Sequence, residues 1–422
     1  MLVVRALSIR FRSFNLANSA GLAIAAGLLS AAPAKADTAE SAATLPSAKV
    51  TVDAAVEARA TSIVSDEGKV FVPGRELSQF RPAAAADDHT IDYSYFDEAL
   101  EWFVVPMGPS IRETPRRAEP RTGTRRIYGH ESRYRLEGNR VAFSYFDNDI
   151  RASLTEYRED LERVGSDLDL TRLPRNEQLA FWLNLHNVAV IEALAYEYPL
   201  AQPSQRTFGS NEAMLDNAKL VIVAGVELSP RDIRERIVYP NWSDPRVIYG
   251  FWRGEIGGPT LQRVAFSGDN VSQMLGFSAE EFVNSLRGVE NTGKTLRVSQ
   301  IYEEASPFYF EDDAALRSHL NGFARDEVKE VIAKTDRTII NDYEKDVADL
   351  SRGERDPALW NLLVTDSVGP FAITTAQRTR PNPVIQRLME ERSEKLRRAV
   401  RRGIRTGNVI IGQEGLEAKE VE

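Results

Sequence analysis

The sequence predicts an α+β fold, in which a single mixed domain packs a buried central helix on a small, largely antiparallel sheet. The segment from Leu173 to Leu200 is apolar on almost every side, which is typical of a helix inside a core. Short stretches of alternating apolar and polar residues indicate strands. These strands mix with helical segments without the regular alternation of a parallel sheet, which favours α+β over α/β.

The N-terminus has the pattern of a secretory signal peptide. Residues 1–12 carry three arginines and no acid, and the apolar run at residues 21–30 is too short to span a bilayer. Small residues at Ala34 and Ala36 stand at cleavage spacing. We therefore expect cleavage after Ala36 and a soluble protein in the bacterial periplasm.

Composition limits the chemistry that the chain can perform. The 422 residues carry a net charge of −9, and residues 1–36 hold four basic and no acidic residues, so the mature chain would carry −13. Such a charge argues against general affinity for nucleic acid. The absence of cysteine excludes disulfides, thiolate metal sites and a thiol nucleophile.

The chain divides into four parts by composition. Residues 37–86 are rich in Ala, Ser, Asp and Pro, which predicts a flexible leader after the signal peptide of residues 1–36. The α+β domain is expected over residues 87–375. Residues 376–422 are expected to form a basic amphipathic helix and a polar tail.

Local patterns predict the elements of the domain in order. Helical spacing of apolar residues is found at residues 92–104, 153–164, 173–200, 229–238 and 316–334, the last as one long helix. Strand-like segments are found at residues 139–149, 244–261 and 295–302, and a hairpin at residues 218–229 turns at Ala224 and Gly225.

Polar residues on the central helix are informative because buried polar groups must find partners. At about 100° per residue, Glu177, Asn184 and Asn187 share one stripe of the helix, and His186 faces nearly the opposite side. The stripe is either a structural hydrogen-bond network or the floor of a site.

The stretch GVENTGKT, residues 288–295, has the letters of a phosphate-binding P-loop. A P-loop needs a strand before the loop and a helix after it. Here a helix at residues 278–287, capped by Ser278, precedes the stretch, and the strand at residues 295–302 follows it. We therefore expect a false P-loop and no bound nucleotide. The residues concerned are Gly288, Gly293, Lys294 and Thr295.

The histidines predict no metal site. The chain has four of them, and they form neither an H-E-x-x-H motif nor a pair four residues apart. No other cofactor motif is recognised, so no cofactor is expected. The four are His89, His130, His186 and His319.

The C-terminal helix predicted at residues 384–405 is basic, although the protein is acidic. It carries eight basic and three acidic residues between Arg387 and Arg405. Two interpretations stay open. The helix either packs on or extends from the domain, or it makes peripheral contact with an anionic membrane or another envelope polymer.

Four blocks of the chain resemble, in the same order, those of the domain-of-unknown-function family 547. The resemblance covers about residues 89–335, and its most specific part is AFWLNLHN. The family occurs in exported bacterial proteins and in plants, and its activity is unsettled. The blocks are NEQLAFWLNLHNVAVIEALAYEYP, VAGVELSPRDIRERIV, DPRVIYGFWRGEIGGPTL and LRVSQIYEEASPFYF.

The resemblance implies a thiol–imidazole centre that this chain lacks. Members commonly carry Ile-Glu-His in the second block, and a His and two Cys in the third. This chain has Ile233-Arg234-Glu235 in the second block; Ile248 stands at the His position of the third, and Arg253 and Gly258 stand at the Cys positions. The residues that match are Glu177, Asn184, Asn187, Asp244, Pro245, Arg246, Gly254 and Pro259, with His186 in place of the usual Tyr.

Two roles are open for the matching residues. Glu177, Asn184 and Arg246 could form a buried, hydrogen-bonded charge pair that fixes the central helix. Alternatively, they line a pocket with Asn187, where Glu177 is a general base or a ligand anchor. Arg253 and Glu255 are then candidate ligand-binding residues.

The sequence thus favours a periplasmic, non-catalytic binding or scaffold protein, whose partner is an unidentified protein or cell-envelope ligand. The alternative is a hydrolase or transferase of envelope material that uses carboxylate and His chemistry. Convergence of Glu177, Asn184, Arg246 and Arg253 on an open cleft would favour the alternative.

Overall fold

The computed structural model describes residues 3–4, 77–116, 130–354, 362–367, 373–378 and 383–404. The predicted signal peptide, apart from residues 3–4, and the leader up to residue 76 lie outside the described residues. Strand β1 (Val3–Val4) pairs in parallel with β2 (Thr90–Ile91).

The described fold begins about ten residues before the predicted domain boundary at residue 87. A short 3₁₀ helix, η3 (Leu77–Phe80), buries both of its terminal side chains. The rings of Phe80 and Trp182 meet edge to face with their centroids 5.2 Å apart, an arrangement that aromatic pairs prefer. The end of the predicted leader is therefore part of the core.

The first elements follow the predicted order, but the strand predicted at residues 139–149 covers only its first three residues, because a 3₁₀ helix and the start of α2 replace the rest. Helix α1 (Ser94–Phe103) leads into β3 (Val104–Pro106), which pairs antiparallel with β4 (Asn139–Val141). After a 3₁₀ turn, Asp147 caps helix α2 (Asn148–Asp167) by accepting the Ile150 N–H.

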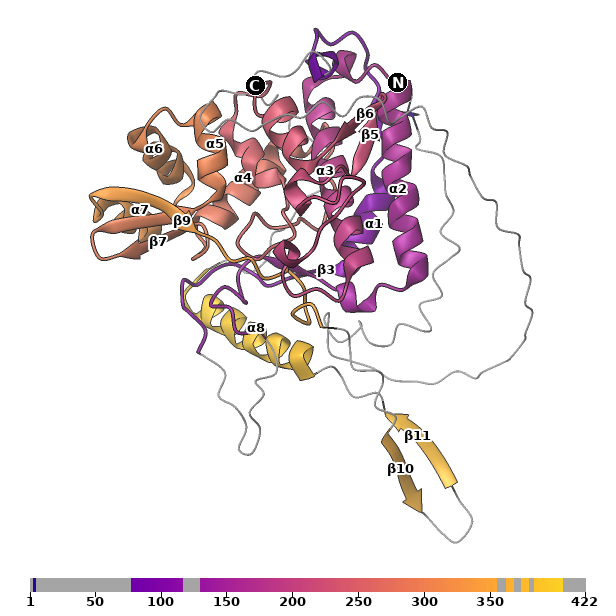
Figure 1. The fold of residues 1–422 in the computed structure, drawn as a ribbon. Helices are drawn as coiled ribbons and strands as arrows, with labels where there is room; N and C mark the ends of the chain where they lie inside the picture. Colours follow the sequence, from indigo (N-terminus) through magenta and orange to yellow (C-terminus); the bar gives the residue numbers. More distant parts are fainter. Residues whose placement is uncertain are drawn as a thin grey trace, which may run out of the picture. The chain divides into compact units, whose positions relative to one another are not determined.

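Helix α3 (Arg175–Glu197) is the predicted central helix, and it is confirmed. It begins after Pro174 and packs against α2, α4 (Val271–Val283) and the helical turn η8 (Asp232–Val238) (Figure 1). Its side chains are buried except for Arg175, Ala193, Tyr196 and Glu197. Among the described residues, it is the one helix long and apolar enough to cross a membrane, and 83% of its apolar stretch is buried inside the protein.

The hairpin after α3 is also confirmed. Strands β5 (Val221–Val223) and β6 (Val226–Leu228) are antiparallel, and Ala224 and Gly225 between them have φ angles of 48° and 77°. Two left-handed residues are what the tightest hairpins require. The Ser229 hydroxyl then accepts the Asp232 N–H at the start of η8, as its sequence predicts.

The predicted strand at residues 244–261 is wrong. Residues Pro245–Gly250 form a 3₁₀ helix, η9, and no described residue of this segment belongs to a named strand. Asp244 accepts the Arg246 N–H, and Pro245 at the first position fixes a helical φ angle. The segment is largely buried, so its apolar residues follow no helical or strand period. Hydrophobic periodicity therefore cannot distinguish a short buried helix from a buried strand here.

GVENTGKT lies in a three-stranded sheet. Strand β7 (Val289–Thr292) turns at residues 293–294 into β8 (Thr295–Ser299), and β8 pairs in parallel with β9 (Arg337–Asp342). Helix α4 ends before β7, and Ser278 lies inside α4, so its predicted role as an N-cap is wrong. The stretch is therefore a β-hairpin, and the turn leads into a strand and not into the helix that a P-loop needs.

The predicted long helix at residues 316–334 is in fact two helices. After α5 (Ile301–Tyr309) come α6 (Asp313–Phe323) and α7 (Asp326–Ala333). Between them, the side chain of Asn284 donates to Phe323 O at 2.8 Å and accepts the Arg325 N–H at 2.7 Å. These bonds satisfy backbone groups that the break exposes.

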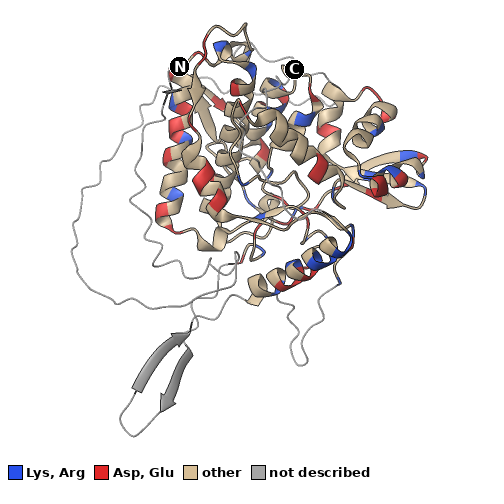
Figure 2. Ribbon diagram, turned by 180° about the vertical axis from the view of Figure 1, so that it is seen from behind, with Lys and Arg blue, Asp and Glu red and all other residues tan. Residues whose placement is uncertain are grey.

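The C-terminal part contains a hairpin and the basic helix. Strands β10 (Leu362–Ser367) and β11 (Ile373–Arg378) are antiparallel, and helix α8 (Pro383–Arg401) follows. The inner side of α8 is buried on the domain, where Lys395 donates to Gly108 O at 3.1 Å and Leu136 O at 2.6 Å. Lys and Arg gather toward its C-terminal end (Figure 2). With its small sheets and buried helix, the α+β class is confirmed.

We expect Lys294→Ala to leave the protein unchanged. The Lys294 side chain is 87% exposed, and its ion pair with Asp336 spans 3.9 Å between two exposed groups. Such a substitution changes the free energy of unfolding by less than about 0.5 kcal/mol. Urea unfolding measures this, and titration calorimetry should show no saturable ATP binding. Binding of ATP that depends on Lys294 would contradict the hairpin assignment.

Candidate functional site

Glu177, the first residue of the predicted stripe, binds two backbone segments to α3. Its Oε1 accepts the Ile91 N–H at 2.9 Å, and its Oε2 accepts the Gly268 N–H at 3.0 Å. A Cβ atom at position 268 would collide with Oε2, so this approach requires glycine. Burial raises the pKa of the Glu177 carboxyl, and the two N–H groups oppose that rise. The geometry favours a structural role.

Asn184 and Asn187 bind backbone groups at the end of η9 and in the chain that follows it. Asn184 donates to Phe266 O at 2.7 Å and accepts the Phe266 N–H at 3.0 Å. Asn187 donates to Gly250 O at 3.0 Å and accepts the Trp252 N–H at 2.9 Å. Both amides are 3% exposed or less, so the stripe is a buried network between α3 and backbone groups.

Arg246 does not join this network. Its Nε donates to Asp244 Oδ2 at 2.7 Å, and its Nη1 donates to Ser272 O at 3.2 Å. The predicted charge pair with Glu177 and Asn184 is therefore replaced by a local pair within η9. Glu177, Asn184, Arg246 and Arg253 do not converge on one cleft.

Arg253 instead belongs to a buried group that we call the arginine cluster, formed by Arg234, Arg253, Glu304 and Asp216. Arg234 donates to both carboxylate oxygens of Glu304, at 2.8 and 3.0 Å. Arg253 does the same with two bonds of 2.8 Å. The side chains of Arg234, Arg253 and Glu304 are 0%, 9% and 11% exposed. Two bidentate pairs thus share one carboxylate.

Asp216 and His186 complete the surroundings of Arg234. Asp216, whose side chain is 37% exposed, accepts from Arg234 at 3.1 Å. His186 Nε2 lies 3.1 Å from Arg234 Nη1, and burial together with Arg234 lowers the pKa of this His to about 3. The neutral ring accepts from Arg234 at Nε2, so Nδ1 carries the hydrogen and donates to Asn187 at 3.1 Å. His186 thereby links the cluster to the stripe.

The charges of the cluster balance. Burial opposes ionisation of Glu304, but Arg234 and Arg253 hold its pKa well below the usual range. Two guanidinium groups therefore face two carboxylates, those of Glu304 and Asp216. A buried charge is tolerated when it is paired and hydrogen-bonded in this way.

Two further carboxyl groups flank the cluster, and their pKa values are raised into the neutral range. Burial, and then the charge of Glu304, raise the pKa of Glu235 to about 7. Burial raises the pKa of Glu255 to about 8, and Asp216 contributes to this rise. Protonation of both groups preserves the charge balance of the cluster.

The cluster unites the positions at which this chain departs from the pattern implied by the family. Arg234, Glu235 and Arg253 lie together, and a Cβ atom at Gly258 would stand 3.3 Å from the Cβ of Arg253. Ile248, by contrast, is fully buried in the core. The positions that the resemblance assigns to an acid and a Cys are thus held by Arg234 and Arg253, which are ion-paired with Glu304.

Sequence reasoning missed Glu304 and Asp216. Glu304 follows Glu303 near the start of a helix, a position where acidic residues are usually solvated, and Asp216 lies in the short 3₁₀ helix η7 (Leu215–Asn217). No local pattern marks either residue. In the part of the chain that the structure describes, no three His, Asp or Glu residues are placed to hold a metal ion.

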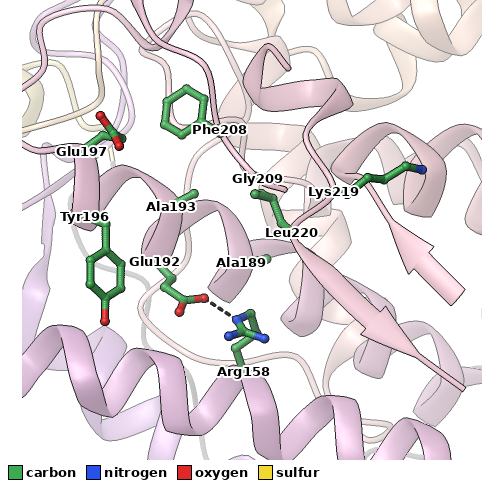
Figure 3. Close-up of a pocket in the computed structure, with 10 residues that line it drawn as sticks. All are labelled: Arg158, Ala189, Glu192, Ala193, Tyr196, Glu197, Phe208, Gly209, Lys219 and Leu220. Atoms are coloured by element: carbon green, nitrogen blue, oxygen red, sulfur yellow. Dashed lines mark hydrogen bonds and ion pairs between the residues drawn. The ribbon is translucent and has the colours of Figure 1, made fainter. Parts of the chain in front are cut away.

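An open pocket of about 240 Å³ lies between α2, α3 and the loop before β5, and sequence analysis did not predict it. Figure 3 shows the ion pair between Arg158 and Glu192 at one side of it. The pocket is lined by Arg158, Ala189, Glu192, Ala193, Tyr196, Glu197, Phe208, Gly209, Lys219 and Leu220.

We expect Glu304→Gln to destabilise the protein strongly. The substitution keeps the side-chain volume but leaves two buried guanidinium groups with Asp216 alone. Removing one partner of a buried ion pair costs roughly 3–5 kcal/mol. Urea unfolding measures the loss, with Glu303→Gln as the matched control because Glu303 is the exposed neighbour. Equal effects of the two substitutions would show that the cluster contributes little.

Stability should fall as pH rises through the neutral range. The folded protein holds the protons of Glu235 and Glu255 to about pH 7 and 8, whereas the unfolded chain releases them near 4.5. Their contribution is complete below about pH 4.5 and is lost as the pH rises toward 8. Below about pH 6.5 the unfolded chain gains protons on His130, His186 and His319, whose pKa values burial lowers, so the fall appears above that range. Melting temperatures should therefore decrease from pH 7 to 8.

The double variant Glu235→Gln/Glu255→Gln should flatten this pH profile, because neither side chain can ionise. Glu212→Gln is the control, since Glu212 is exposed and lies outside the cluster. A variant profile as steep as that of the unmodified protein would contradict the assignment.

The comparisons with known proteins yield one family. No curated protein and no solved structure gives a significant match. A family model matches residues 170–283, which include α3, the β5–β6 hairpin, η8, η9 and α4. This span is shorter than the predicted resemblance, but it contains three of its four blocks. Residues 170–283 thus match the family described as "Protein of unknown function, DUF547", and the predicted resemblance is confirmed over that span.

Proposed function

We propose that this chain is an exported, non-catalytic binding or scaffold protein, in which an ion-paired cluster replaces the catalytic centre implied by the family. The observation that carries the proposal is the shared use of Glu304 by Arg234 and Arg253. These arginines stand at the positions where an acid and a Cys are implied.

The chemistry of the cluster supports this proposal. A guanidinium group is always protonated in proteins, so neither arginine can act as a nucleophile or a general base. Glu304 is ionised, but its oxygens accept four guanidinium N–H bonds. The chain has no cysteine, and the His186 ring is engaged on both nitrogens. The cluster is therefore organised as a structural element.

Export is proposed from the N-terminal sequence. Its basic start, short apolar run and small residues before position 37 are the parts of a signal peptide. An envelope location agrees with the structure of GVENTGKT, which is a hairpin and not the strand–loop–helix of a nucleotide site. In the envelope, the expected partner is a protein or a cell-envelope polymer.

One observation favours the alternative, a hydrolase or transferase that uses carboxylates. The pKa values of Glu235 and Glu255 lie at about 7 and 8, where a carboxyl group can donate and accept protons at physiological pH. Perturbed carboxyl groups beside arginines also occur at catalytic sites. A nucleophile or an activated water would complete such a site.

A peptidoglycan assay separates the two functions. The mature protein, purified from periplasmic extract, should begin at Asp37 by N-terminal sequencing. Incubated with purified peptidoglycan sacculi, it should release no soluble fragments above a buffer control, as measured by chromatography and mass spectrometry. The variants Glu235→Gln and Glu255→Gln should give the same result, because no turnover depends on them.

The contrary result is equally specific. Fragment release by the unmodified protein that falls at least tenfold in Glu235→Gln or Glu255→Gln would establish the carboxylate enzyme. Glu212→Gln serves as the control, since it removes an exposed carboxylate outside the cluster. If the protein is found in the cytosolic fraction with residues 1–36 still attached, the proposal of export is contradicted.

A further inference from the structure

We propose that the pocket beside α3 is a docking site for a second copy of this chain, which inserts Val400 from the C-terminal end of its helix α8. The inference concerns a surface distinct from the arginine cluster and does not depend on whether the protein is catalytic. It follows from the pocket's shape, from its charge and from the exposed residues of the chain.

The shape of the pocket fits one or two side chains. Ala189 and Ala193 are four residues apart on α3, so their small side chains leave a hollow on one face. Phe208 and Leu220 form apolar walls, and Tyr196 stands at the edge with 54% of its surface exposed. A volume of about 240 Å³ lies below the range of ordinary small-molecule sites.

The one charged group of the pocket lining without an ion-pair partner among the described residues is a carboxylate. Arg158 is paired with Glu192 at 2.5 Å, and Lys219 is paired with Asp232 at 2.5 Å. Glu197 also lines the pocket, is exposed and has no partner among the described residues. The lining therefore offers one free carboxylate beside apolar walls.

The loops beside the pocket carry more exposed acidic than basic residues. The exposed acidic residues are Glu212 and Glu227, and the exposed basic residue is Arg206. Glu212 belongs to the loop that includes Gly209 and Lys219 of the lining, and Glu227 pairs with Ile222 across the β5–β6 hairpin. A docking segment that presents an apolar side chain next to basic residues would match both features.

Helix α8 presents such a segment. Val400 is 61% exposed, and Arg397, three residues earlier, lies on the same face of the helix. Arg397 and Arg401 are exposed and have no partner within the described ranges. Figure 2 shows the basic residues gathered at this end of α8. The inner side of the helix is already buried, so this outer face is the one left to bind.

The exposed apolar residues of the chain point to the same pair of surfaces. Within residues 77–116, 130–354 and 383–404, large exposed hydrophobic side chains occur at four positions only, three on the segments that border the pocket and the fourth on α8. They are Tyr196, Met214, Ile222 and Val400.

Docking must join two copies, because α8 of the same chain is engaged elsewhere. Its bonds reach Pro106, Gly108, Glu113 and Arg135, none of which lines the pocket. The two surfaces are different, so the association is heterologous and forms rings or open chains. A contact built on one apolar side chain and one ion pair is weak and depends on concentration.

Sedimentation velocity over a wide range of protein concentration tests this proposal. The unmodified mature protein should self-associate as its concentration rises. Val400→Asp should weaken the association at least tenfold, because a charge enters the apolar pocket. Arg397→Glu and Glu197→Arg should each weaken it by a similar factor, and the double variant should restore it, because the ion pair is re-formed with reversed charges.

Lys329→Glu is the matched control, since it reverses an exposed charge on α7 and should leave the association unchanged. Circular dichroism should show equal melting temperatures for all variants, because every substituted position is exposed. A protein that stays monomeric, or an association that Val400→Asp leaves intact, would overturn the proposal. Binding of α8 to vesicles of anionic phospholipid that needs Val400, without self-association, would also overturn it.

Discussion

The constraint on which the structure depends is the burial of α3 over residues 176–192. Each polar side chain in this stretch must find a partner inside the protein, since an unsatisfied buried group costs about 1–3 kcal/mol. Glu177, Asn184 and Asn187 meet the requirement with backbone groups of residues 91, 250, 252, 266 and 268. These bonds fix the irregular chain around η9, which, among the described residues, otherwise pairs with backbone only at a short antiparallel bridge between Glu255 and Val347. Three side chains on one helix therefore supply much of what holds this long connection in place.

The same bonds position the arginine cluster. Asn187 binds the backbone of Trp252, and Arg253 follows directly, so α3 determines where that guanidinium group enters the interior. His186, one residue before Asn187, accepts from Arg234. Glu304 then satisfies both arginines at once. Buried ion pairs add little net stability compared with apolar packing, but removing one member is costly. The cluster is therefore best understood as a device that fixes one arrangement of η8, α5 and the chain after η9.

The sequence predicted the parts of the fold that local patterns encode. Hydrophobic periodicity located α3, positive-φ turn chemistry located the β5–β6 hairpin, and the order of elements excluded the P-loop. The same methods misassigned residues 244–261, because a segment buried on every side carries no period. They also missed the break at Ala324, which depends on Asn284 about forty residues away. At the candidate site, the sequence alone showed that Arg234 and Arg253 differ from the residues that the family resemblance implies. Their shared partner Glu304 was not, because a contact across fifty to seventy residues leaves no local signal.

The arginine cluster and the pocket are physically connected. On a helix with about 100° per residue, His186, Ala189 and Ala193 fall within about 60° of one another, so α3 turns the same face toward both. The loop before β5 contributes Asp216 to the cluster and Lys219 to the pocket. Lys219 is in turn paired with Asp232 on η8, two residues before Arg234. The same loop therefore joins the lining of the pocket to Asp216, the most exposed carboxylate of the cluster. Because Asp216 pairs with the buried Arg234, the position of this loop matters to a group whose charges must stay paired inside the protein.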